Sequence, residues 1–263
     1  MGHALFLGDR RSGVIDLHTH LLPGVDDGSR ALEVSVQVLE RFGREGVTTV
    51  ACTPHLVASQ AHAAPVEAYA ALRASVQEAT PTGPALVAGF EIMLDRPGFD
   101  LRLPGLSLGD SRAVLVEFPR ASLPPGATDE LLRIRVSGLV PVVAHPERYR
   151  GVTLDMVRAW RELGAVIQGD ALMLLSTGTM AKLARALLED GMYDILASDN
   201  HGDRRSLATV REWLLAVGGD EQGQLLTEEN PRRVLEDAAM LPVPPFRPDQ
   251  SMWQKLRAML GRR

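Results

Sequence analysis

The feature that most constrains the fold of this chain is a regular alternation of short apolar runs with longer amphipathic stretches. The apolar runs have the length of β-strands and are nearly continuous, which is typical of strands buried on both faces of a parallel sheet. Strands that alternate with helices form βα units, so the pattern predicts an α/β fold. The predicted strands are Gly13–His18, Thr48–Thr53, Leu86–Glu91, Ala113–Phe118, Val140–His145, Ala165–Gln168 and Ile195–Asp199.

Helical periodicity fills the intervals between these runs. At the last helix Asn230 is expected to be the N-cap, because Pro231 suits the first helical position. The link Ile92–Arg112 is rich in Gly and Pro and is expected to be irregular. Seven predicted strands with helices between them favour a closed barrel over an open sheet. The predicted helices are Ala31–Phe42, Val66–Thr80, Thr128–Val136, Leu154–Leu163, Thr179–Glu189, Leu207–Ala216 and Pro231–Ala239.

The 263 residues are expected to form a single domain over residues 1–241, with an N-terminal arm at 1–12 and a tail at 242–263. The tail begins with a stiff proline-rich spacer, Pro242–Pro245. It continues into Ser251–Arg263, where apolar and basic residues follow a helical spacing. This segment is expected either to pack on the barrel or to dock weakly on an anionic membrane or a partner.

Composition limits the classes of function. The net charge of −5 argues against nucleic-acid binding by a broad basic face. The single cysteine, Cys52, excludes a disulfide framework and a cysteine-based zinc site, and it fits the reducing cytoplasm. No apolar run approaches the ~20 residues of a membrane span, and Met1–Arg11 lacks the pattern of a signal peptide. The protein is therefore expected to be cytoplasmic.

Polar residues gather at the carboxyl ends of the predicted strands. Parallel barrels place these ends on one rim, where active sites are built. Five of the seven histidines would meet there beside three or four carboxylates, whereas chance would scatter histidines over loops and helix faces. Along the chain, the strand ends carry His18 with His20, then His55, Glu91, Glu117, His145, Gln168, and finally Asp199 with His201.

Two short motifs have the spacing of metal ligands. His18 and His20 are two residues apart at a strand end, so both rings can point to one side. Asp199 and His201 repeat this spacing with a carboxylate and an imidazole, and the loop residues Asp26-Asp27 offer a further carboxylate. Either motif alone is more often incidental. Together with the other strand-end residues, they indicate a metal centre.

The ligand types narrow the metal and the chemistry. Imidazole and carboxylate without thiolate suit zinc, manganese or iron rather than calcium. About eight candidate ligands are too many for one ion, because a catalytic zinc takes about three protein ligands plus water. Two or three ions are expected, with Glu91 as the bridging carboxylate. Ions ~3.5–4 Å apart clamp the attacking and leaving oxygens of a displacement at phosphorus, so phosphoester hydrolysis is the predicted reaction.

Arginines follow two of the strand ends. Arg148 comes three residues after a strand-end histidine, and Arg204-Arg205 closely follow another. A guanidinium group binds phosphate oxygens bidentately, so these are candidate phosphate ligands, although each could instead form a surface salt bridge. The phosphate-binding loop of cysteine phosphatases is missing after Cys52. No phosphate loop, nucleophile elbow or dinucleotide fingerprint occurs either.

In their order along the chain, these motifs resemble the polymerase-and-histidinol-phosphatase (PHP) superfamily, and more narrowly its bacterial protein-tyrosine phosphatases of capsule and exopolysaccharide operons. The resemblance covers about Ile15–Leu241. It implies a distorted (β/α)7 TIM-like barrel, a trinuclear and commonly manganese-dependent centre, and removal of phosphate from tyrosines of a cognate kinase that controls polysaccharide export. The segments that carry the resemblance are IDLHTHLLPGVDDGSR (Ile15–Arg30), TPH (Thr53–His55), GFEI (Gly89–Ile92), LVEFP (Leu115–Pro119), AHPERY (Ala144–Tyr149) and SDNH (Ser198–His201).

The resemblance also implies roles for single residues. Arg148 would bind the phosphate, together with Arg205, or with Arg204 as the alternative. Asp199 and His201 would serve catalysis as well as metal binding. The implied metal ligands are His18, His20, Asp27, His55, Glu91, His145, Asp199 and His201, with Glu117 at or just behind the metals.

The chain departs from the family pattern at two places, which bears on substrate preference. Leu56 stands where another histidine is frequent, and Gly169-Asp170-Ala171 stands where Asn-Ala-Gly is expected. No residue is identified as a dedicated general acid, and His62 is expected to be an exposed loop residue. The reaction would not need such an acid, because a tyrosine leaving group has a pKa of only ~10.

Three alternatives to a protein-tyrosine phosphatase stay open. The first is a PHP-type phosphatase of small phosphomonoesters such as histidinol phosphate or nucleotides. The second is a metal-dependent amidohydrolase, which is disfavoured because no lysine stands at a strand end. The third is a metal-binding scaffold without catalysis, which is disfavoured because the ligand set is intact.

Overall fold

The computed structural model describes residues 13–248 and Ser251. The predicted N-terminal arm at 1–12 lies outside the described residues. So does the predicted amphipathic segment Ser251–Arg263, apart from its first residue.

The strand pairs are all parallel, as predicted, and they form two sheets. The smaller sheet has the order β1-β2-β4 and the larger one has the order β3-β5-β6-β7-β8-β9. The strands are β1 (Val14–Thr19), β2 (Val47–Cys52), β3 (His55–Val57), β4 (Ala85–Ala88), β5 (Glu91–Met93), β6 (Ala113–Glu117), β7 (Val140–Ala144), β8 (Val166–Asp170) and β9 (Ile195–Ala197).

The chain passes from the smaller sheet to the larger one at two places. The second predicted strand, Thr48–Thr53, forms β2, and the unpredicted strand β3 begins beyond Pro54, because proline cannot donate a ladder hydrogen bond. The third predicted strand is interrupted at Gly89-Phe90, between β4 and β5. A side chain at Gly89 would meet Leu108 Cδ2 at 2.7 Å, so the chain approaches its neighbour closely at this break. The barrel is distorted where these strands pass from one sheet to the other.

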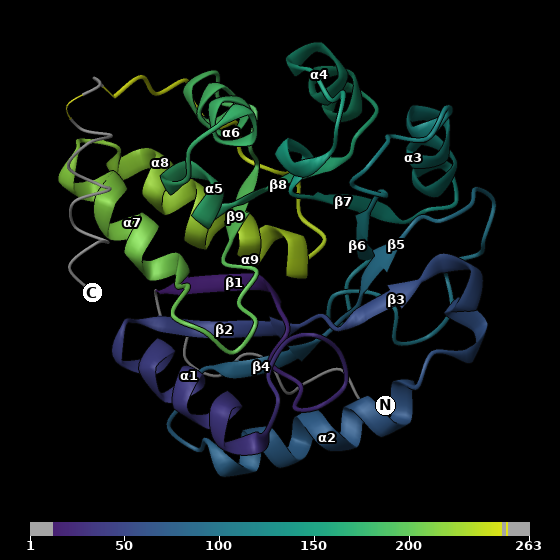
Figure 1. Ribbon diagram of the computed structural model, residues 1–263, viewed down its shortest axis with the longest axis vertical. Coiled ribbons are helices and arrows are strands. Elements are labelled where there is room, and N and C mark those ends of the chain that lie inside the picture. The colour runs from purple at the N-terminus through teal and green to yellow at the C-terminus, as the bar shows by residue number, and fades with distance from the viewer. Residues whose placement is uncertain (1–12, 249–250, 252–263) are drawn as a thin grey trace.

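The last strand returns to the first at the carboxyl ends. Asp199 N donates to His18 O (3.0 Å) and His20 N donates to Asn200 O (2.8 Å). A parallel bridge joins Thr19 to Asn200, and β9 lies beside β1 in Figure 1. The arrangement is a distorted (β/α)7 TIM-like barrel, in which these bonds join the first and last strands where the predicted rim lies.

Helices cover both sheets (Figure 1). Below the smaller sheet lie α1 and α2, whereas α7 and α9 lie on its other side against β1, and the remaining helices surround the larger sheet. The predicted helices all form, whereas α5 and α8 were not predicted. The link between β5 and β6 is irregular, as expected. The helical elements are α1 (Leu32–Arg44), η1 (Ala58–Ala63), α2 (Val66–Ala79), α3 (Ala127–Val136), η2 (Pro146–Arg148), α4 (Leu154–Glu162), α5 (Ala171–Leu175), α6 (Thr179–Glu189), α7 (Leu207–Ala216), α8 (Asp220–Gln224), the π-helical η3 (Leu225–Glu229) and α9 (Asn230–Leu235).

The formation of α4 illustrates how sequence produces packing. The Thr153 side chain accepts a hydrogen bond from Met156 N and thereby caps the helix. One face of the helix buries Val157 and Trp160. The indole Nε1 of Trp160 donates to Thr128 Oγ1 (2.9 Å), so the buried ring keeps a hydrogen-bond partner and ties α4 to α3.

The predicted N-cap at Asn230 is wrong. Helical segments α8, η3 and α9 follow one another without a break, and Asn230 has helical backbone angles of φ −69° and ψ −41°. Its buried amide group instead donates to Asp194 O and to Leu241 O, both at 2.9 Å, and its oxygen accepts from Leu241 N at 2.8 Å. The side chain therefore ties α9 to the start of β9 and to the segment after the helix.

We expect Asn230→Ala to lower the free energy of unfolding by about 1–3 kcal/mol, because two carbonyl groups and one N–H lose their buried partner. Urea unfolding at fixed metal concentration measures the change. As a control, Glu236→Ala at the exposed end of α9 is expected to stay within about 0.5 kcal/mol. Equal losses in the two variants would contradict the role of the amide.

Candidate metal centre

All nine residues expected at the metal centre come together in one cluster at the rim of the barrel. Their donor atoms form four overlapping groups, and the atoms of each group lie within 4.8 Å of one another. The groups are His20 with Asp27, His55 and His201; His18 with His20 and Asp199; His18 with Glu91 and His145; and His55 with Glu91 and Glu117.

The two histidines at the end of β1 face each other. His18 Nε2 lies 3.1 Å from His20 Nε2. On the far side of the rings, His18 Nδ1 lies 3.0 Å from Gln168 Oε1 and His20 Nδ1 lies 2.7 Å from Asp26 Oδ2. These oxygens only accept, so each neutral ring carries its proton on Nδ1 and keeps the Nε2 lone pair for the centre.

The carboxylate of Glu91, at the start of β5, lies in the middle of the cluster and is completely buried. Its Oε2 is 3.0 Å from His55 Nδ1 and 3.3 Å from His18 Nε2. The same oxygen is 3.3 Å from His20 Nε2, and Oε1 is 2.7 Å from His145 Nε2. One carboxylate therefore contacts four imidazole rings, which come from the ends of β1 and β7 and from the start of β3.

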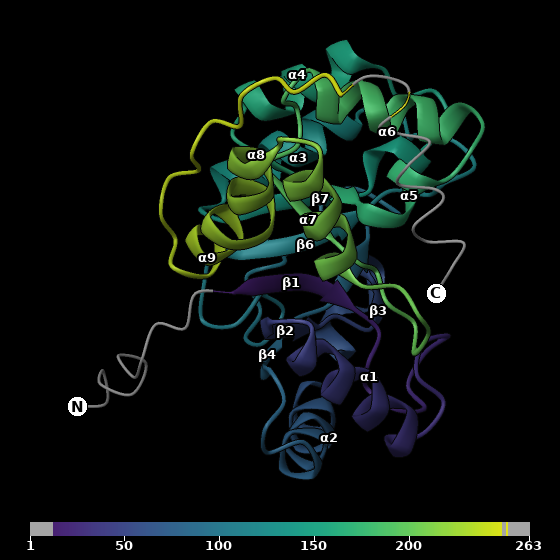
Figure 2. The ribbon, with the colours of Figure 1, turned by 90° about the vertical axis from the view of Figure 1, so that its left-hand side faces the viewer.

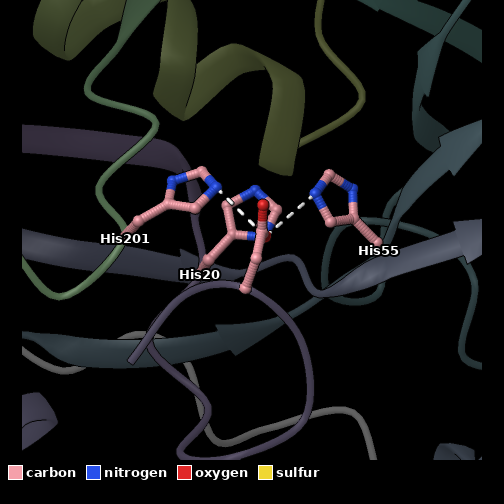
Figure 3. A group of neighbouring side chains, drawn as sticks. His20, His55 and His201 are labelled. Carbon is pink, nitrogen blue, oxygen red and sulfur yellow. Dashed lines mark ion pairs between the residues drawn. The ribbon is translucent and has the colours of Figure 1, made fainter. Parts of the chain in front are cut away.

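A more open group lies toward solvent. Figure 3 shows the ring of His20 between those of His201 and His55, with ring centroids 4.1 Å and 4.5 Å away respectively. Asp27 Oδ1 is 3.3 Å from His55 Nε2 and 3.3 Å from His201 Nε2. Asp27 is 69% exposed, so this side of the centre is accessible from solvent.

The loop after β1 folds tightly against His20. Ser29 N donates to His20 O (2.8 Å), and Gly28 N donates to Asp26 Oδ1 (2.9 Å). A Cβ on Gly28 would lie 2.2 Å from His20 O, so only glycine fits here. This close approach places Asp26 behind the His20 ring and Asp27 in front of it.

Two residues of the cluster have left-handed backbone conformations. His145 has φ 32° and Asp199 has φ 49°, and neither is glycine. Such conformations are uncommon in non-glycine residues and concentrate at functional sites. His145 directly follows β7 and Asp199 stands two residues after β9, so each turn redirects its side chain into the cluster.

The pKa values of the carboxylates reflect the crowding of charge. Burial alone would raise the pKa of Glu91, but the His18 charge and the His145 hydrogen bond hold it well below its usual range. Burial, reinforced by the charge of Glu91, raises the pKa of Glu117 to about 7. Protons and cations therefore compete for the same donor atoms.

The donor set fits divalent cations. Glu91 Oε2 is buried and no N–H group of the described chain is aimed at it in hydrogen-bond geometry, although three imidazole nitrogens surround it. A buried carboxylate oxygen without such a partner is unfavourable unless another group uses its lone pairs. Imidazole nitrogens and carboxylate oxygens that point to shared positions would supply ligands to more than one ion.

Arg148 reaches the cluster from η2 but is engaged by acids. Its guanidinium donates to Asp170 Oδ2, from Nε at 3.0 Å and from Nη2, and Nη2 also lies 2.6 Å from Asp199 Oδ2. Asp170 N in turn donates to the buried carboxyl of Glu147 (2.7 Å). Burial and the charge of Asp170 raise the pKa of Glu147 to about 8.

The structure separates the two adjacent arginine candidates. Arg205 Nη1 lies 3.6 Å from Asp199 Oδ2, while its Nε donates to Asp203 Oδ2 (2.7 Å). Arg204 is exposed and lines a neighbouring pocket together with Arg205. Arg205 is therefore the one of the pair that the structure brings next to the cluster.

Several polar residues behind the cluster were not predicted in their supporting roles. Asp26 holds His20, Gln168 holds His18, and Asp170 holds Arg148. The sequence signals were present but ambiguous: Asp26 stands beside Asp27, and Gln168 and Asp170 end a strand. Only the folded chain shows which neighbour each one contacts.

Two further residues bear on alternative chemistries. Cys52 is buried, and burial raises the pKa of its thiol to about 12, so it stays protonated near neutral pH. His62 is exposed, as expected, but it lies on η1 rather than on a plain loop. It lines a pocket that also contains His55 and Glu117.

Within the described residues, the chain has no helix that is long and apolar enough to cross a membrane.

Known proteins share this sequence pattern along most of the chain. The family model for capsular polysaccharide synthesis proteins of the CpsB/CapC type matches residues 14–236. The tyrosine-protein phosphatase YwqE of Bacillus subtilis (strain 168) is 27% identical over 255 residues, which covers 88% of this chain and 95% of that protein. The tyrosine-protein phosphatase CpsB of Streptococcus pneumoniae is 28% identical over 243 residues, which covers 85% of this chain and 99% of that protein.

Solved structures agree with the sequence comparison. A structure from work on YwqE and CpsB, described as unique metal-dependent tyrosine phosphatases, matches with a TM-score of 0.73 at 26% identity and covers 90% of this chain and 99% of that chain. The Escherichia coli phosphotriesterase homology protein matches with a TM-score of 0.55 at 13% identity, and the match covers 86% of this chain and 100% of that chain. This likeness shows the fold alone. The chain belongs to the CpsB/CapC family of capsular polysaccharide synthesis proteins.

Proposed function

We propose that this protein is a metal-dependent protein-tyrosine phosphatase whose substrate is phosphotyrosine on a bacterial tyrosine kinase of capsule or exopolysaccharide synthesis. The observation that carries the proposal is the set of four overlapping histidine and carboxylate groups on the barrel rim. Two relatives named tyrosine-protein phosphatase, from Bacillus subtilis and Streptococcus pneumoniae, support the choice of substrate. The proposed phosphatase domain is residues 1–241, and the proposed location is the cytoplasm.

The proposed cofactor is manganese, as two or three ions, with iron or zinc as alternatives. Bound divalent ions supply Lewis-acid stabilisation of the negative charge that develops at a phosphoryl group. Glu91 is the proposed bridging residue, because its Oε2 faces three imidazole nitrogens. The proposed ligands are His18, His20, Asp27, His55, Glu91, Glu117, His145, Asp199 and His201.

Two arginines are proposed to orient the phosphate. Arg148 Nη2 and Arg205 Nη1 both approach Asp199 Oδ2, at 2.6 Å and 3.6 Å. Their guanidinium groups thus point to one edge of the cluster, where bidentate bonds to phosphate oxygens would fix the substrate. Asp170 holds the Arg148 side chain from behind, which limits its rotation before substrate binds.

A pocket beside the cluster fits the tyrosine ring. It has a volume of about 610 Å³, and Leu56, Tyr69 and Met93 give it an apolar wall. His55 and Glu117 also line it, so a ring in this pocket would direct its phosphate toward the metal ligands. A phenol with a pKa of ~10 is a good leaving group and needs no strong general acid.

The function is tested by reconstitution. We expect a chelator to abolish hydrolysis of a phosphotyrosine peptide and Mn²⁺ to restore it, with histidinol phosphate and short oligonucleotides hydrolysed far more slowly. Preference for a small phosphomonoester would contradict the proposed substrate.

Iodoacetamide at pH 8 is expected to leave activity unchanged, because the Cys52 thiol has a pKa of about 12 and is protonated there. Inactivation by alkylation that Cys52→Ala prevents would contradict a metal mechanism.

Asp26→Asn is expected to weaken metal binding by about 10–100-fold, because the amide keeps an acceptor for His20 Nδ1 but removes the negative charge that raises the basicity of the ring. Turnover measured against free Mn²⁺ concentration, together with the metal content of the purified protein, gives the shift. Asp110→Asn, at an exposed site away from the rim, is the matched control. An unchanged metal dependence in the first variant would remove Asp26 from the centre.

Tyr69→Ala is expected to raise KM for aryl phosphates about tenfold, the loss of about 1.4 kcal/mol of ring contact, with little change for a small alkyl phosphate. Tyr69→Phe keeps the ring, which stacks on Phe90 at 5.8 Å, and is expected to behave as the wild type. Steady-state kinetics on both substrate types provides the comparison. Parallel losses on aryl and alkyl substrates would show that the pocket does not hold the ring.

A further inference from the structure

A second cavity lies at the opposite end of the barrel from the metal centre. It has a volume of about 760 Å³ and is lined by the residues that begin β6, β7 and β8, by Asp194 before β9, and by part of α9. Figure 2 shows α9 at the end of the molecule where β1 begins, whereas the loop between β9 and α7 lies at the other end. That loop carries His201, so the two sites face opposite directions.

The lining of this cavity is rich in arginine. The five arginines outnumber the three carboxylates, so the formal charge of the lining is +2 although the whole chain carries −5. We call it the arginine cavity. The arginines are Arg112, Arg135, Arg158, Arg161 and Arg233, and the carboxylates are Glu162, Asp194 and Asp237.

Two of the lining arginines are neutralised by lining carboxylates. Arg161 Nη2 lies 2.8 Å from Asp194 Oδ1, and Arg112 Nε lies 3.4 Å from Asp237 Oδ2. Asp194 also accepts from Ile167 N (2.9 Å), which fixes it at the cavity floor. A third lining arginine, Arg158, is paired with Asp155 outside the lining, so only Arg135 and Arg233 are left without a carboxylate partner among the described residues.

Within the described residues, Arg135 and Arg233 form no ion pair with any carboxylate. Arg233 Nη1 donates to the carbonyl oxygen of Ala239 (2.9 Å), and its Nε is buried without a hydrogen-bond partner. The Arg135 side chain packs on Gly164, where a Cβ would lie 2.7 Å from Arg135 Nε. The fold thus holds two guanidinium groups, both partly buried and neither with a carboxylate partner, in one concave site.

We propose that the arginine cavity binds a small molecule that carries a phosphate group. Guanidinium forks match phosphate oxygens, and Arg135 and Arg233 supply the charge that no carboxylate of the lining balances. The volume lies within the ~300–1,000 Å³ range of ligand pockets. The ligand would enter from the face opposite the metal centre, so this site is separate from the phosphate position of the proposed reaction.

The test compares two double variants by calorimetric titration of the metal-loaded protein, with free metal held constant. In Arg135→Ala/Arg233→Ala we expect binding at one site to weaken at least about tenfold, as for lost charge-assisted bonds. In Arg96→Ala/Arg247→Ala, whose side chains are 71% and 75% exposed, we expect no change. Hydrolysis of a phosphotyrosine peptide should persist in both, because none of the four arginines belongs to the metal cluster or lines the proposed tyrosine pocket.

Inorganic phosphate and ADP are the two probes. Loss of phosphate binding in the cavity variant would identify a site for the free anion, and loss of ADP binding alone would identify a site for a nucleotide-sized ligand. Identical isotherms in wild type and cavity variant, with both probes, would overturn the proposal.

Hydrogen exchange gives a second readout that needs no variant. Either probe should slow exchange in the wild type at residues 158–166 and 233–240, which line the cavity. Unchanged exchange in both segments at saturating phosphate and ADP would overturn the proposal even if the double variant failed to fold.

Discussion

The carboxylate of Glu91 is the interaction on which the metal centre depends. It has no exposed surface and contacts four imidazole rings. The parallel register makes this possible, because His55 and Glu91 stand opposite each other in β3 and β5. A buried carboxylate is stable only with such partners. The alignment of the strands therefore determines both where the candidate ligands lie and how the buried charge is balanced.

The general architecture and the location of the centre could be predicted from periodicity and from the residues at strand ends. Apolar runs located the strands other than β3, and the parallel-barrel rule placed the histidines and Glu91 on one rim. The break at Gly89 inside the third predicted strand could not be predicted, because it depends on the close approach to Leu108 and not on local propensity. Asn230 was misjudged for a related reason, since its partners lie up to 36 residues away along the chain.

The supporting residues were harder to predict than the candidate ligands. Asp26 contacts a ring six residues earlier, and Gln168 contacts one 150 residues earlier. No periodic pattern encodes such pairs, and they form only in the folded barrel. The choice between Arg204 and Arg205 is of the same kind, because adjacent residues differ only in how the short loop after His201 turns.

The left-handed backbone at His145 and Asp199 has a consequence for how the protein acquires its metals. Backbone hydrogen bonds of the barrel brace both turns, because Asp199 N donates to His18 O and Arg148 N donates to His145 O. The side chains of these two residues are therefore already positioned for binding, and little conformational entropy is lost when ions bind. A flexible peptide with the same ligands would lack this preorganisation, so the centre belongs to the folded chain and not to its local motifs.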